Sequence, residues 1–400
     1  MPDLESFPFP PCPRGRPADA YARRLAHEPA GRVRLPSGDE VVLTMRHDDT
    51  LAVLSDARFT RELFYEGAPR LYEGFSFSDI PGLLISTDPP RHTRLRRLLA
   101  GAFTPRRIEQ WRPRVRAVAD ELLAGLPGEF DFVSGFAFPL PVQVICEVMG
   151  VPGIDTERVA SWAEAMLSTS GLPLEEKLTA GAGFHAYVAG LIEEHRADPG
   201  DGMLAVLVHA RDEEDRLTEE ELVVQTMGLL LGGYETTGSV LSRSAQRLLD
   251  PRPEGYGRLA ADPSLVPAAV EELLRLEFPG DTTPIRVALE DVELPSGAVI
   301  AKGQGVIASF IGANHDPAVF PDPAAFRLDR PMPSPHLGFS RGIHYCLGAN
   351  LARMELQEAL SALVTGLPEL RLAVPADELD WTTGTMAHRP ARLPVVKDGR

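Results

Sequence analysis

The sequence of 400 residues predicts a mainly helical protein with small β-sheets. A capping-box sequence, Thr218 to Glu221, precedes an apolar run from Leu222 to Leu249, which indicates a helix long enough to cross a whole domain. Two short runs of β-forming residues, each next to a Pro-Ser-Gly turn, indicate hairpins. Since no long Ser/Gly tract or like-charge run separates these elements, we expect one domain over residues 1–400, with about residues 1–20 irregular.

Composition excludes several classes of function. A hydrophobic fraction of 44% is enough to bury a large core, and a net charge of −17 argues against nucleic acid as a partner. The three cysteines, Cys12, Cys146 and Cys346, are too few and too odd in number for a disulfide framework, and such a set is typical of a reducing cytosol. No signal-peptide pattern opens the sequence, and two prolines interrupt its most apolar segment, residues 136–148. We therefore expect a cytoplasmic protein that does not span a membrane.

The expected hairpins lie far apart in the chain. The first is expected where residues 32–35 and 40–44 flank the turn Pro36-Ser37-Gly38. The second is expected where the run 287–294 meets Pro295-Ser296-Gly297 before Val299 and Ile300. Between them, Pro89 and Pro90 predict the start of a helix. On that helix His92 and Arg96 are four residues apart and share a face that could bind carboxylates.

The segment that follows is strongly basic. From Arg91 to Arg116 the chain carries nine arginines against one acid, Glu109. A solvated helix surface explains most such arginines. The alternative is that some of them bind an anionic cofactor while others face an acidic protein partner.

The middle of the predicted long helix departs from helical composition. Residues Gly232 to Gly238 place glycines, hydroxyls and an acid where a central helix should be apolar. Such residues can loosen the backbone ladder into a local bulge that admits water or a ligand. A kink held by packing is one interpretation. Because Glu235 adjoins Thr236, we favour a site that handles protons.

A loop containing Phe339 and Gly342 delivers Cys346 to the start of an amphipathic helix. Unpaired N–H groups and the helix dipole favour a thiolate there, and Gly342 and Gly348 would allow a flat ligand close to the backbone. A buried structural cysteine is the alternative. Upstream, Glu272 and Arg275 are three apart on a predicted helix, and a surface ion pair of little energetic value is the default interpretation.

Together, in order and spacing, these segments resemble the soluble bacterial cytochromes P450, which are haem-thiolate monooxygenases. The resemblance runs from about Val33 to the C-terminus and rests on residues 88–96, 233–237, 272–275, 286–292 and 313–323 and on the cysteine loop, which has Phe339, Gly342, His344, Cys346 and Gly348. It implies a single-domain fold shaped like a triangular prism, rich in helices with a β-rich region.

The resemblance also assigns roles to individual residues. Cys346 would be the axial thiolate of haem b, iron protoporphyrin IX. Haem-contacting positions of the family are matched by His92, Arg96, Arg286, His344, Phe339, Gly342 and Gly348. Glu235 and Thr236 match the acid and the alcohol that relay protons during oxygen activation. The Glu272–Arg275 pair would be buried and would brace the loop before the cysteine.

Four positions depart from the family pattern. His315 and Ala325 replace a frequent Arg and a frequent Arg or His, so the usual three-residue network around Glu272 is expected to be incomplete, with Arg330 as the candidate replacement. Ser340 and Gly232 replace a frequent Gly and a frequent Ala, which leaves the chemistry intact.

The resemblance implies a small-molecule substrate, O2, and electrons from NAD(P)H through a ferredoxin reductase and a ferredoxin, delivered to a monomer. The substrate pocket would be lined by residues 64–84, 166–184, 229–236, 279–285 and 384–387, including Leu229, Gly232, Gly233, Thr283, Ile285 and Met386. These segments mix apolar residues with a few hydroxyls, among them Ser76 and Ser78, so a mainly apolar compound is expected. Hydroxylation of a secondary metabolite, such as a polyketide, peptide or terpenoid in antibiotic biosynthesis, is the default activity.

Other activities remain open within this resemblance. Epoxidation and oxidative aromatic coupling would use the same iron. A peroxide-driven enzyme would need neither the acid and alcohol nor a ferredoxin, and a non-catalytic haem-binding recruitment domain would not need them either. Since Cys346, Glu235 and Thr236 are all present, an active oxygenase is preferred.

Overall fold

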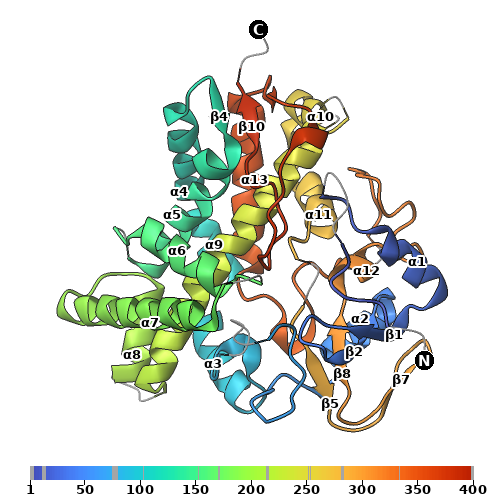
Figure 1. Cartoon of the computed structure of the whole chain (residues 1–400). Coiled ribbons are helices and arrows are strands. Elements are labelled where there is room, and N and C mark those ends of the chain that lie inside the picture. The colour runs from blue at the N-terminus through green and yellow to red at the C-terminus, as the bar shows by residue number, and fades with distance from the viewer. Residues whose placement is uncertain are drawn as a thin grey trace. The chain divides into compact units, whose positions relative to one another are not determined.

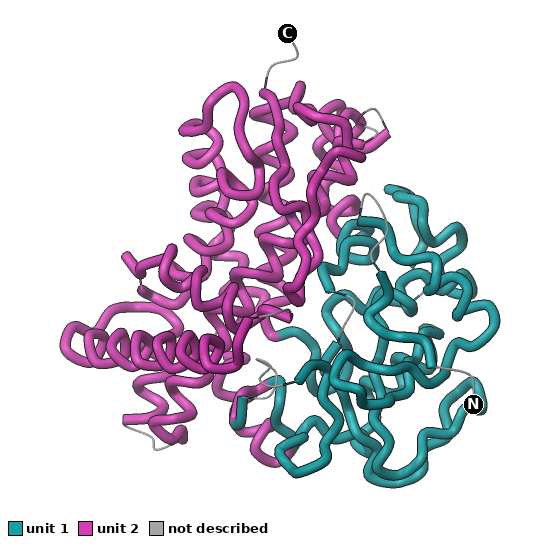
Figure 2. The backbone as a smooth tube through the Cα atoms, in the orientation of Figure 1, with its two compact units in different colours: residues 1–81, 85–88, 271–346 teal, residues 82–84, 89–270, 347–400 magenta. Residues whose placement is uncertain are grey.

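The computed structural model describes residues 4–10, 15–73, 80–101, 103–151, 153–169, 172–212, 216–250, 252, 254–280, 283–332 and 334–397. The chain forms two compact units (Figure 2). Unit 1 comprises residues 1–81, 85–88 and 271–346, and unit 2 comprises residues 82–84, 89–270 and 347–400. The chain thus leaves unit 1 to build the helical unit 2 and returns to unit 1 before its last segment. The single domain expected from the sequence stays a prediction.

Unit 1 contains a five-stranded sheet in the order β1-β2-β8-β5-β3. Its strands are β1 (Ala30–Arg34), β2 (Glu40–Thr44), β3 (Phe59–Thr60), β5 (Arg286–Ala288) and β8 (Gly305–Ala308). The first predicted hairpin is confirmed, because β1 and β2 pair antiparallel around the Pro-Ser-Gly turn. β2 then pairs parallel with β8, which joins residues from the two ends of the unit's sequence. The strands β2, β5 and β8 are almost wholly buried, so the sheet forms part of the core.

The second predicted hairpin is also present, but its first strand is shorter than expected. β6 (Val292–Glu293) pairs antiparallel with β7 (Val299–Ile300) in a separate sheet. The predicted continuous run over 287–294 is wrong, because the chain bends after Ala288 and changes its partner. The amide of Leu289 bonds to the Arg58 carbonyl, and residues beyond it leave the five-stranded sheet.

Short helices surround the sheets of unit 1: α1 (Asp19–His27), α2 (His47–Ser55), α12 (Phe310–Asn314) and the C-terminal part of α11 (Val266–Leu276). One core cluster gathers Phe7, Phe9 and Tyr21 in edge-to-face contacts about which the sheet residues Val33 and Leu43 pack. These aromatic contacts link the N-terminal segment to the sheet.

Unit 2 is built around α9 (Glu219–Leu249), which contacts α5, α7 and α13 (Figure 1). The remaining helices are α3 (Arg91–Ala100), α4 (Pro105–Gly125), α5 (Pro139–Met149), α6 (Thr156–Met166), α7 (Leu174–Ala197), α8 (Met203–Asp212), α10 (Tyr256–Ala261) and α13 (Ala349–Gly366). Across both units, short 3₁₀ turns lie at Leu84–Ser86, Pro263–Leu265, Gly342–His344 and Ala376–Glu378, and a π-helical turn lies at Val133–Ala137. A three-stranded sheet, β4-β10-β9, is formed by Glu129–Asp131, Pro394–Val396 and Arg371–Leu372.

The predicted capping box at the start of α9 is confirmed. The Thr218 hydroxyl accepts a hydrogen bond from the Glu221 amide, and the Glu221 carboxylate accepts one from the Thr218 amide, both at 3.1 Å. Both faces of α9 are covered over most of its length, so the helix is stabilised by tertiary packing in addition to its cap.

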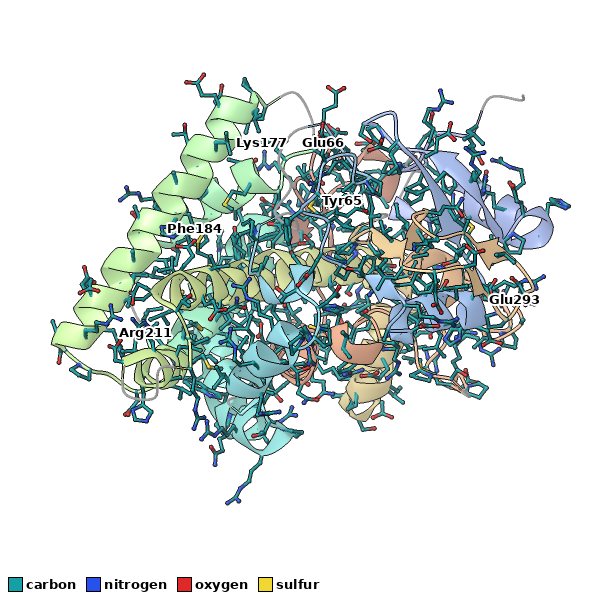
Figure 3. The ribbon with its side chains drawn as sticks, turned by 90° about the horizontal axis from the view of Figure 1, so that it is seen from below. Tyr65, Glu66, Lys177, Phe184, Arg211 and Glu293 are labelled. Atoms are coloured by element: carbon teal, nitrogen blue, oxygen red, sulfur yellow. The ribbon has the colours of Figure 1, made fainter. Side chains whose placement is uncertain are left out.

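The helix α7 packs against α9, and its buried residues include Phe184, Val188 and Ile192. Phe184, labelled in Figure 3, is fully buried and packs on Trp162 of α6 with ring centroids 5.7 Å apart. Nearer the start of α7, the ammonium of Lys177 donates to the Ser168 carbonyl at 2.7 Å. In the part of the chain that the structure describes, no helix has the length and apolar character needed to cross a bilayer.

Candidate functional site

The cysteine loop belongs to unit 1 and is held by α11 and α2. Cys346 is exposed, and its amide donates to the Phe339 carbonyl at 2.9 Å, which closes the loop. α13 begins at Ala349, so the cysteine lies just before the helix, as predicted. Gly342 has a φ of +70°, and a Cβ there would lie 2.4 Å from the Leu54 carbonyl oxygen of α2. Glycine at 342 is therefore required by contact with α2, a different reason from the flat ligand expected from the sequence.

Gly348 behaves differently, because a Cβ built on it would meet no heavy atom within 4 Å. The backbone beside the cysteine is thus open to a close approach, as the flat-ligand interpretation requires. Ser340 adopts a φ of +62°, which explains why the family often has glycine at this position.

His336 lies at the start of the cysteine loop and connects this loop to α11. Its Nδ1 accepts a hydrogen bond from the Gly338 amide at 3.1 Å, so the proton of the neutral ring is on Nε2, 3.2 Å from the Glu271 carboxylate. Gly338 itself packs so closely that a Cβ would lie 2.6 Å from the Leu274 carbonyl oxygen. The Asn314 side chain accepts a further bond from the Leu337 amide at 2.7 Å. The loop is thus fixed by hydrogen bonds well before it reaches the cysteine.

The Glu272–Arg275 pair is completely buried, so the surface interpretation is wrong and the bracing role implied by the resemblance has the required burial. Two parallel hydrogen bonds join the side chains, at 2.9 and 2.8 Å. Arg330 completes the network, since its Nε donates to the Glu272 carboxylate at 2.8 Å. The predicted gap at Ala325 is filled by backbone, because its carbonyl accepts hydrogen bonds from both arginines, at 3.3 and 2.7 Å. The expectation of an incomplete network is therefore wrong.

Arg286, on β5, is a buried cation that suits an anionic ligand. Burial lowers the pKa of its guanidinium to about 10, and the charge of Asp88 offsets only part of this effect. The Asp88 carboxylate already accepts hydrogen bonds from the Thr60 hydroxyl and the Arg61 amide. Within the described residues, no side-chain hydrogen bond is formed by Arg286. A ligand carboxylate would supply the missing anion, so this residue fits a haem propionate.

The predicted helix after Pro89-Pro90 is α3, with Pro90 as its N-cap. His92 is buried and Arg96 half-buried on one side of it. On the exposed side, Arg91 and Arg94 both bind the Glu221 carboxylate, at 2.9 and 2.6 Å. Burial raises the pKa of Glu221, but the hydrogen bonds from Arg94, the Thr218 amide and Arg91 outweigh this effect and lower it overall.

The basic segment is therefore less positive than its sequence indicates. Acidic residues of the same unit also neutralise three further arginines: Arg112 pairs with Glu109 and Glu358, Arg114 with Glu147 and Glu121, and Arg116 with Asp120. Arg97, Arg106 and Arg107 are exposed and make no ion pair within the described part of the chain. Only these three remain as candidates for a docking partner, together with Arg96 as a candidate cofactor ligand.

The helix α9 is continuous through Gly232 to Gly238, so the local bulge expected there does not interrupt it. The Thr236 hydroxyl donates instead to the Gly232 carbonyl at 2.7 Å, one turn earlier. Glu235 accepts a hydrogen bond from the Ser239 hydroxyl at 3.2 Å. Its carboxylate is 3.7 Å from the Arg389 guanidinium, which belongs to the C-terminal part of unit 2.

Burial raises the pKa of Glu235, and the positive charge of Arg389 and the hydrogen bond from Ser239 counteract only part of this shift. A carboxyl group with a raised pKa takes up and releases protons at a higher pH than an ordinary glutamate does, which suits a group that handles protons. Neither Arg389 nor Ser239 was found from the sequence. Ser239 lies one helical turn after Glu235 and could have been noticed from this spacing, whereas no local pattern marks Arg389.

The predicted pocket residues are distributed over both units. On α9, a Cβ on Gly232 would meet open space, whereas one on Gly233 would lie 2.8 Å from Ile145, so Gly233 allows close packing of α5 on α9. Leu229 is half-buried on the same helix. Thr283 and Ile285 of unit 1 are buried, and the Thr283 hydroxyl donates to the Ala308 carbonyl at 2.8 Å. Ser76 and Ser78 lie outside the described residues.

Met386 lies in a turn near the C-terminus of the described chain. Its amide donates to the Leu167 carbonyl at 3.0 Å, directly after α6. The two segments expected to line the pocket around Met166 and Met386 are thus joined by backbone hydrogen bonds.

Comparison with known proteins identifies the family. A family model described as Cytochrome P450 matches residues 261–368. Nocardicin C N-oxygenase of Nocardia uniformis subsp. tsuyamanensis is 43% identical, over 98% of this chain and 99% of the relative. Mycinamicin IV hydroxylase/epoxidase of Micromonospora griseorubida is 43% identical over 95% of each chain.

The fold agrees with these relatives. The crystal structure of the LnmA cytochrome P450 hydroxylase from the leinamycin biosynthetic pathway of Streptomyces atroolivaceus S-140 matches with a TM-score of 0.89 and 41% identity, covering 98% of this chain and 100% of that one. The predicted mainly helical fold with small sheets is confirmed. The chain belongs to the cytochrome P450 family.

Proposed function

We propose that this monooxygenase inserts one oxygen atom of O2 into a mainly apolar secondary metabolite, with hydroxylation as its default reaction. One feature supports oxygen activation above the others: the half-buried acid Glu235 adjoins the alcohol Thr236 in the middle of α9. The names of the relatives, an N-oxygenase and a hydroxylase/epoxidase, favour the same class of substrate. The second name also keeps epoxidation open as an alternative reaction, and oxidative coupling remains a further one.

The family's haem-thiolate cofactor fits the residues that each unit presents. We propose haem b, with Cys346 as the iron ligand and Phe339, Gly342 and Gly348 as neighbours of the ring. The proposed propionate-binding residues are Arg286 and His344 of unit 1 and His92 and Arg96 of unit 2. When bound, this group supplies an iron whose thiolate ligand favours cleavage of the O–O bond. The buried cation Arg286 and the open backbone at Gly348 support the assignment.

Glu235 and Thr236 would then handle protons. The raised pKa of Glu235 lets its carboxyl group hold a proton closer to neutral pH than an exposed glutamate does. The Thr236 hydroxyl donates its proton to a backbone carbonyl, so its oxygen keeps lone pairs that can accept a hydrogen bond. We propose that the acid holds and supplies protons and that the Thr236 hydroxyl orients them within the site.

Electrons would come from NAD(P)H through a ferredoxin reductase and an acidic ferredoxin. We propose that Arg97, Arg106 and Arg107 attract the ferredoxin, because they are the arginines of the basic segment left without acidic partners in the described chain. Arg97→Glu combined with Arg107→Glu should slow ferredoxin-supported turnover and spare peroxide-supported turnover. Arg258→Glu, at another exposed arginine of unit 2, serves as the control. Equal losses with both electron sources would contradict this docking site. We also propose that the protein is cytoplasmic and monomeric.

The absorption spectrum of the reduced, carbon-monoxide-bound protein tests the cofactor assignment. The thiolate-type Soret shift should be lost in Cys346→Ala and kept in Cys146→Ala. Cys146 is a matched control because it is buried on α5, where burial raises the pKa of its thiol to about 12 and keeps it neutral. A Cys346→Ala protein with an unchanged spectrum would refute the assignment.

The variant Thr236→Ala distinguishes the proposed function from two others. A recruitment domain that merely binds haem would tolerate Thr236→Ala without consequence, and a peroxide-driven enzyme would keep its peroxide-supported rate in that variant. We expect instead a loss of O2-dependent product with continued consumption of electrons.

A further inference from the structure

Residues 380–391 form a hairpin-like segment that positions Arg389. The amide of Thr382 donates to the Arg389 carbonyl and that of Ala391 to the Asp380 carbonyl, both at 2.8 Å. The Thr382 hydroxyl also accepts a bond from the Arg389 amide at 3.1 Å. The backbone of Arg389 is therefore held by two bonds to a single opposite residue.

This segment is attached to the rest of unit 2 at both its base and its tip. At the base, Arg243 of α9 donates to the His388 carbonyl at 2.8 Å and lies over the Trp381 ring, which stacks on His388. At the tip, the Thr169 amide donates to the Gly384 carbonyl at 2.7 Å. The hairpin-like segment therefore has a defined position relative to α9.

The Arg389 guanidinium faces Glu235 at a separation longer than a normal hydrogen bond. The guanidinium carbon lies 4.3 Å from the centre of the Phe138 ring, and its Nε lies 3.7 Å from the Glu235 carboxylate. The side chains of Arg389 and Glu235 keep 20% and 15% of their exposure. The ring holds the cation, and the carboxylate, which also accepts a hydrogen bond from the Ser239 hydroxyl, lies at ion-pair distance from it.

We infer that Arg389 is a positioning residue for Glu235, whose carboxylate it attracts and whose uptake and release of protons it controls. This inference rests on the proposed proton-handling role of Glu235. A buried acid with no cation nearby would keep its proton too firmly to pass it on. A cation in a direct hydrogen bond would keep the acid ionised. The separation observed here lies between these two cases.

The surroundings of Glu235 point to Arg389 as the decisive charge. On α9, Tyr234 and Ser239 are its neighbours, and α6 contributes Glu164, whose negative charge opposes ionisation of Glu235. Burial raises the pKa of Tyr234 to about 12, so the phenol stays neutral. Burial, followed by the charge of Arg243, lowers the pKa of His388 to about 4, so the residue next to Arg389 carries no charge near neutral pH.

A carboxyl titration tests the inference without relying on turnover. The C=O stretching band of protonated carboxyl groups is followed by infrared difference spectroscopy of the holoenzyme as a function of pH, and Glu235→Gln identifies the band of Glu235. Arg389→Gln should move the midpoint of that band upward by roughly 1 pH unit or more, because a cation within ~4–6 Å normally lowers an acid's pKa by that amount. Arg389→Lys keeps the positive charge, so it should return the midpoint most of the way to that of the wild type. Arg392→Gln removes a charge directly after this segment, at a side chain with 78% exposure, and it should leave the midpoint unchanged.

An Arg389→Gln midpoint equal to that of the wild type, or an equal shift in Arg392→Gln, would overturn the inference. Failure of this inference can be distinguished from failure of the proposed function, because the carbon-monoxide spectrum of Arg389→Gln should stay that of a thiolate-ligated haem. In turnover, Arg389→Gln should lower kcat and leave KM unchanged, whereas a merely misfolded segment near Met386 would raise KM as well.

Discussion

Two glutamate–arginine interactions of this protein differ in the way their charges are held. Glu272 in unit 1 is hydrogen-bonded by Arg275 and Arg330 at 2.8–2.9 Å, with every side chain at most 1% exposed. Glu235 in unit 2 lies 3.7 Å from Arg389, with both side chains partly exposed. The first arrangement satisfies its carboxylate completely, so it fixes structure. The second leaves the carboxylate incompletely bound, so its protonation can change.

The buried network should show the largest effect on stability. Arg330→Met removes the bond to Glu272 and the bonds to the Asp322 and Ala325 carbonyls, so the free energy of unfolding should fall by about 3–5 kcal/mol. Urea denaturation measures this loss. Arg327→Met is the matched control, because that side chain is exposed and pairs only with Asp329 in the described chain, so its effect should stay within about 0.5 kcal/mol. Similar losses in both variants would show that burial does not distinguish them.

The Glu235 pair should show the larger effect on catalysis. Glu235→Gln replaces a titratable acid with a neutral amide of similar shape. The kcat for product formation should therefore fall by about 100-fold, the usual contribution of a general acid or base. Assays that compare the amount of product formed with the number of electrons consumed measure this loss of kcat. Glu220→Gln, at an exposed acid of the first turn of α9, is the control and should keep the wild-type rate. A wild-type rate in Glu235→Gln would remove the contrast between the two pairs.

Relief of backbone strain in the cysteine loop should change the free energy of unfolding by a smaller amount and in the opposite direction. Ser340 adopts a φ of +62°, so Ser340→Gly should raise the free energy of unfolding by about 1 kcal/mol. Ser264→Gly, outside the left-handed region and bonded to Asp262, should lower it. Thermal or urea unfolding distinguishes these signs, and a destabilised Ser340→Gly would show that the hydroxyl has a role that the hydrogen bonds do not reveal.

The pH dependence of stability should separate the pairs further. Burial raises the pKa of Glu235 in the folded protein above its unfolded value, so its protonated form is favoured by folding. The stability it contributes is present below the unfolded pKa and is lost as pH rises through the folded pKa. The unfolding free energy of the wild type should therefore fall relative to Glu235→Gln over this pH range. A difference between the two proteins that does not change with pH would contradict the raised pKa.

The sequence predicted the local elements well because their signals act over a few residues. The capping box at Thr218, the hairpin turn after residue 35 and the helix after Pro90 each depend on backbone hydrogen bonds between near neighbours. One exception is the strand expected over 287–294, where apolar residues continue but the chain exchanges one sheet for another. No periodicity records such a change of partner.

The candidate site shows the same division. The motif around Cys346, the acid and alcohol on α9 and the residues His92 and Arg96 were recognisable from their spacing alone. The neutralisation of Arg91 and Arg94 by Glu221 was not, because the three residues are distant in sequence and meet only through the packing of α3 near the start of α9. The basic segment therefore appeared more available to a partner than it is.

By itself, the sequence determined the family, the cysteine that would bind iron and the identity of the acid next to Thr236. Only the tertiary structure decided which arginine each key carboxylate meets: Arg330 with the Ala325 carbonyl around Glu272, and Arg389 opposite Glu235. The physical reason is that a charge interacts with whatever lies within a few ångströms. For residues far apart along the chain, that neighbour is set by the path of the backbone and by burial, which no local pattern contains.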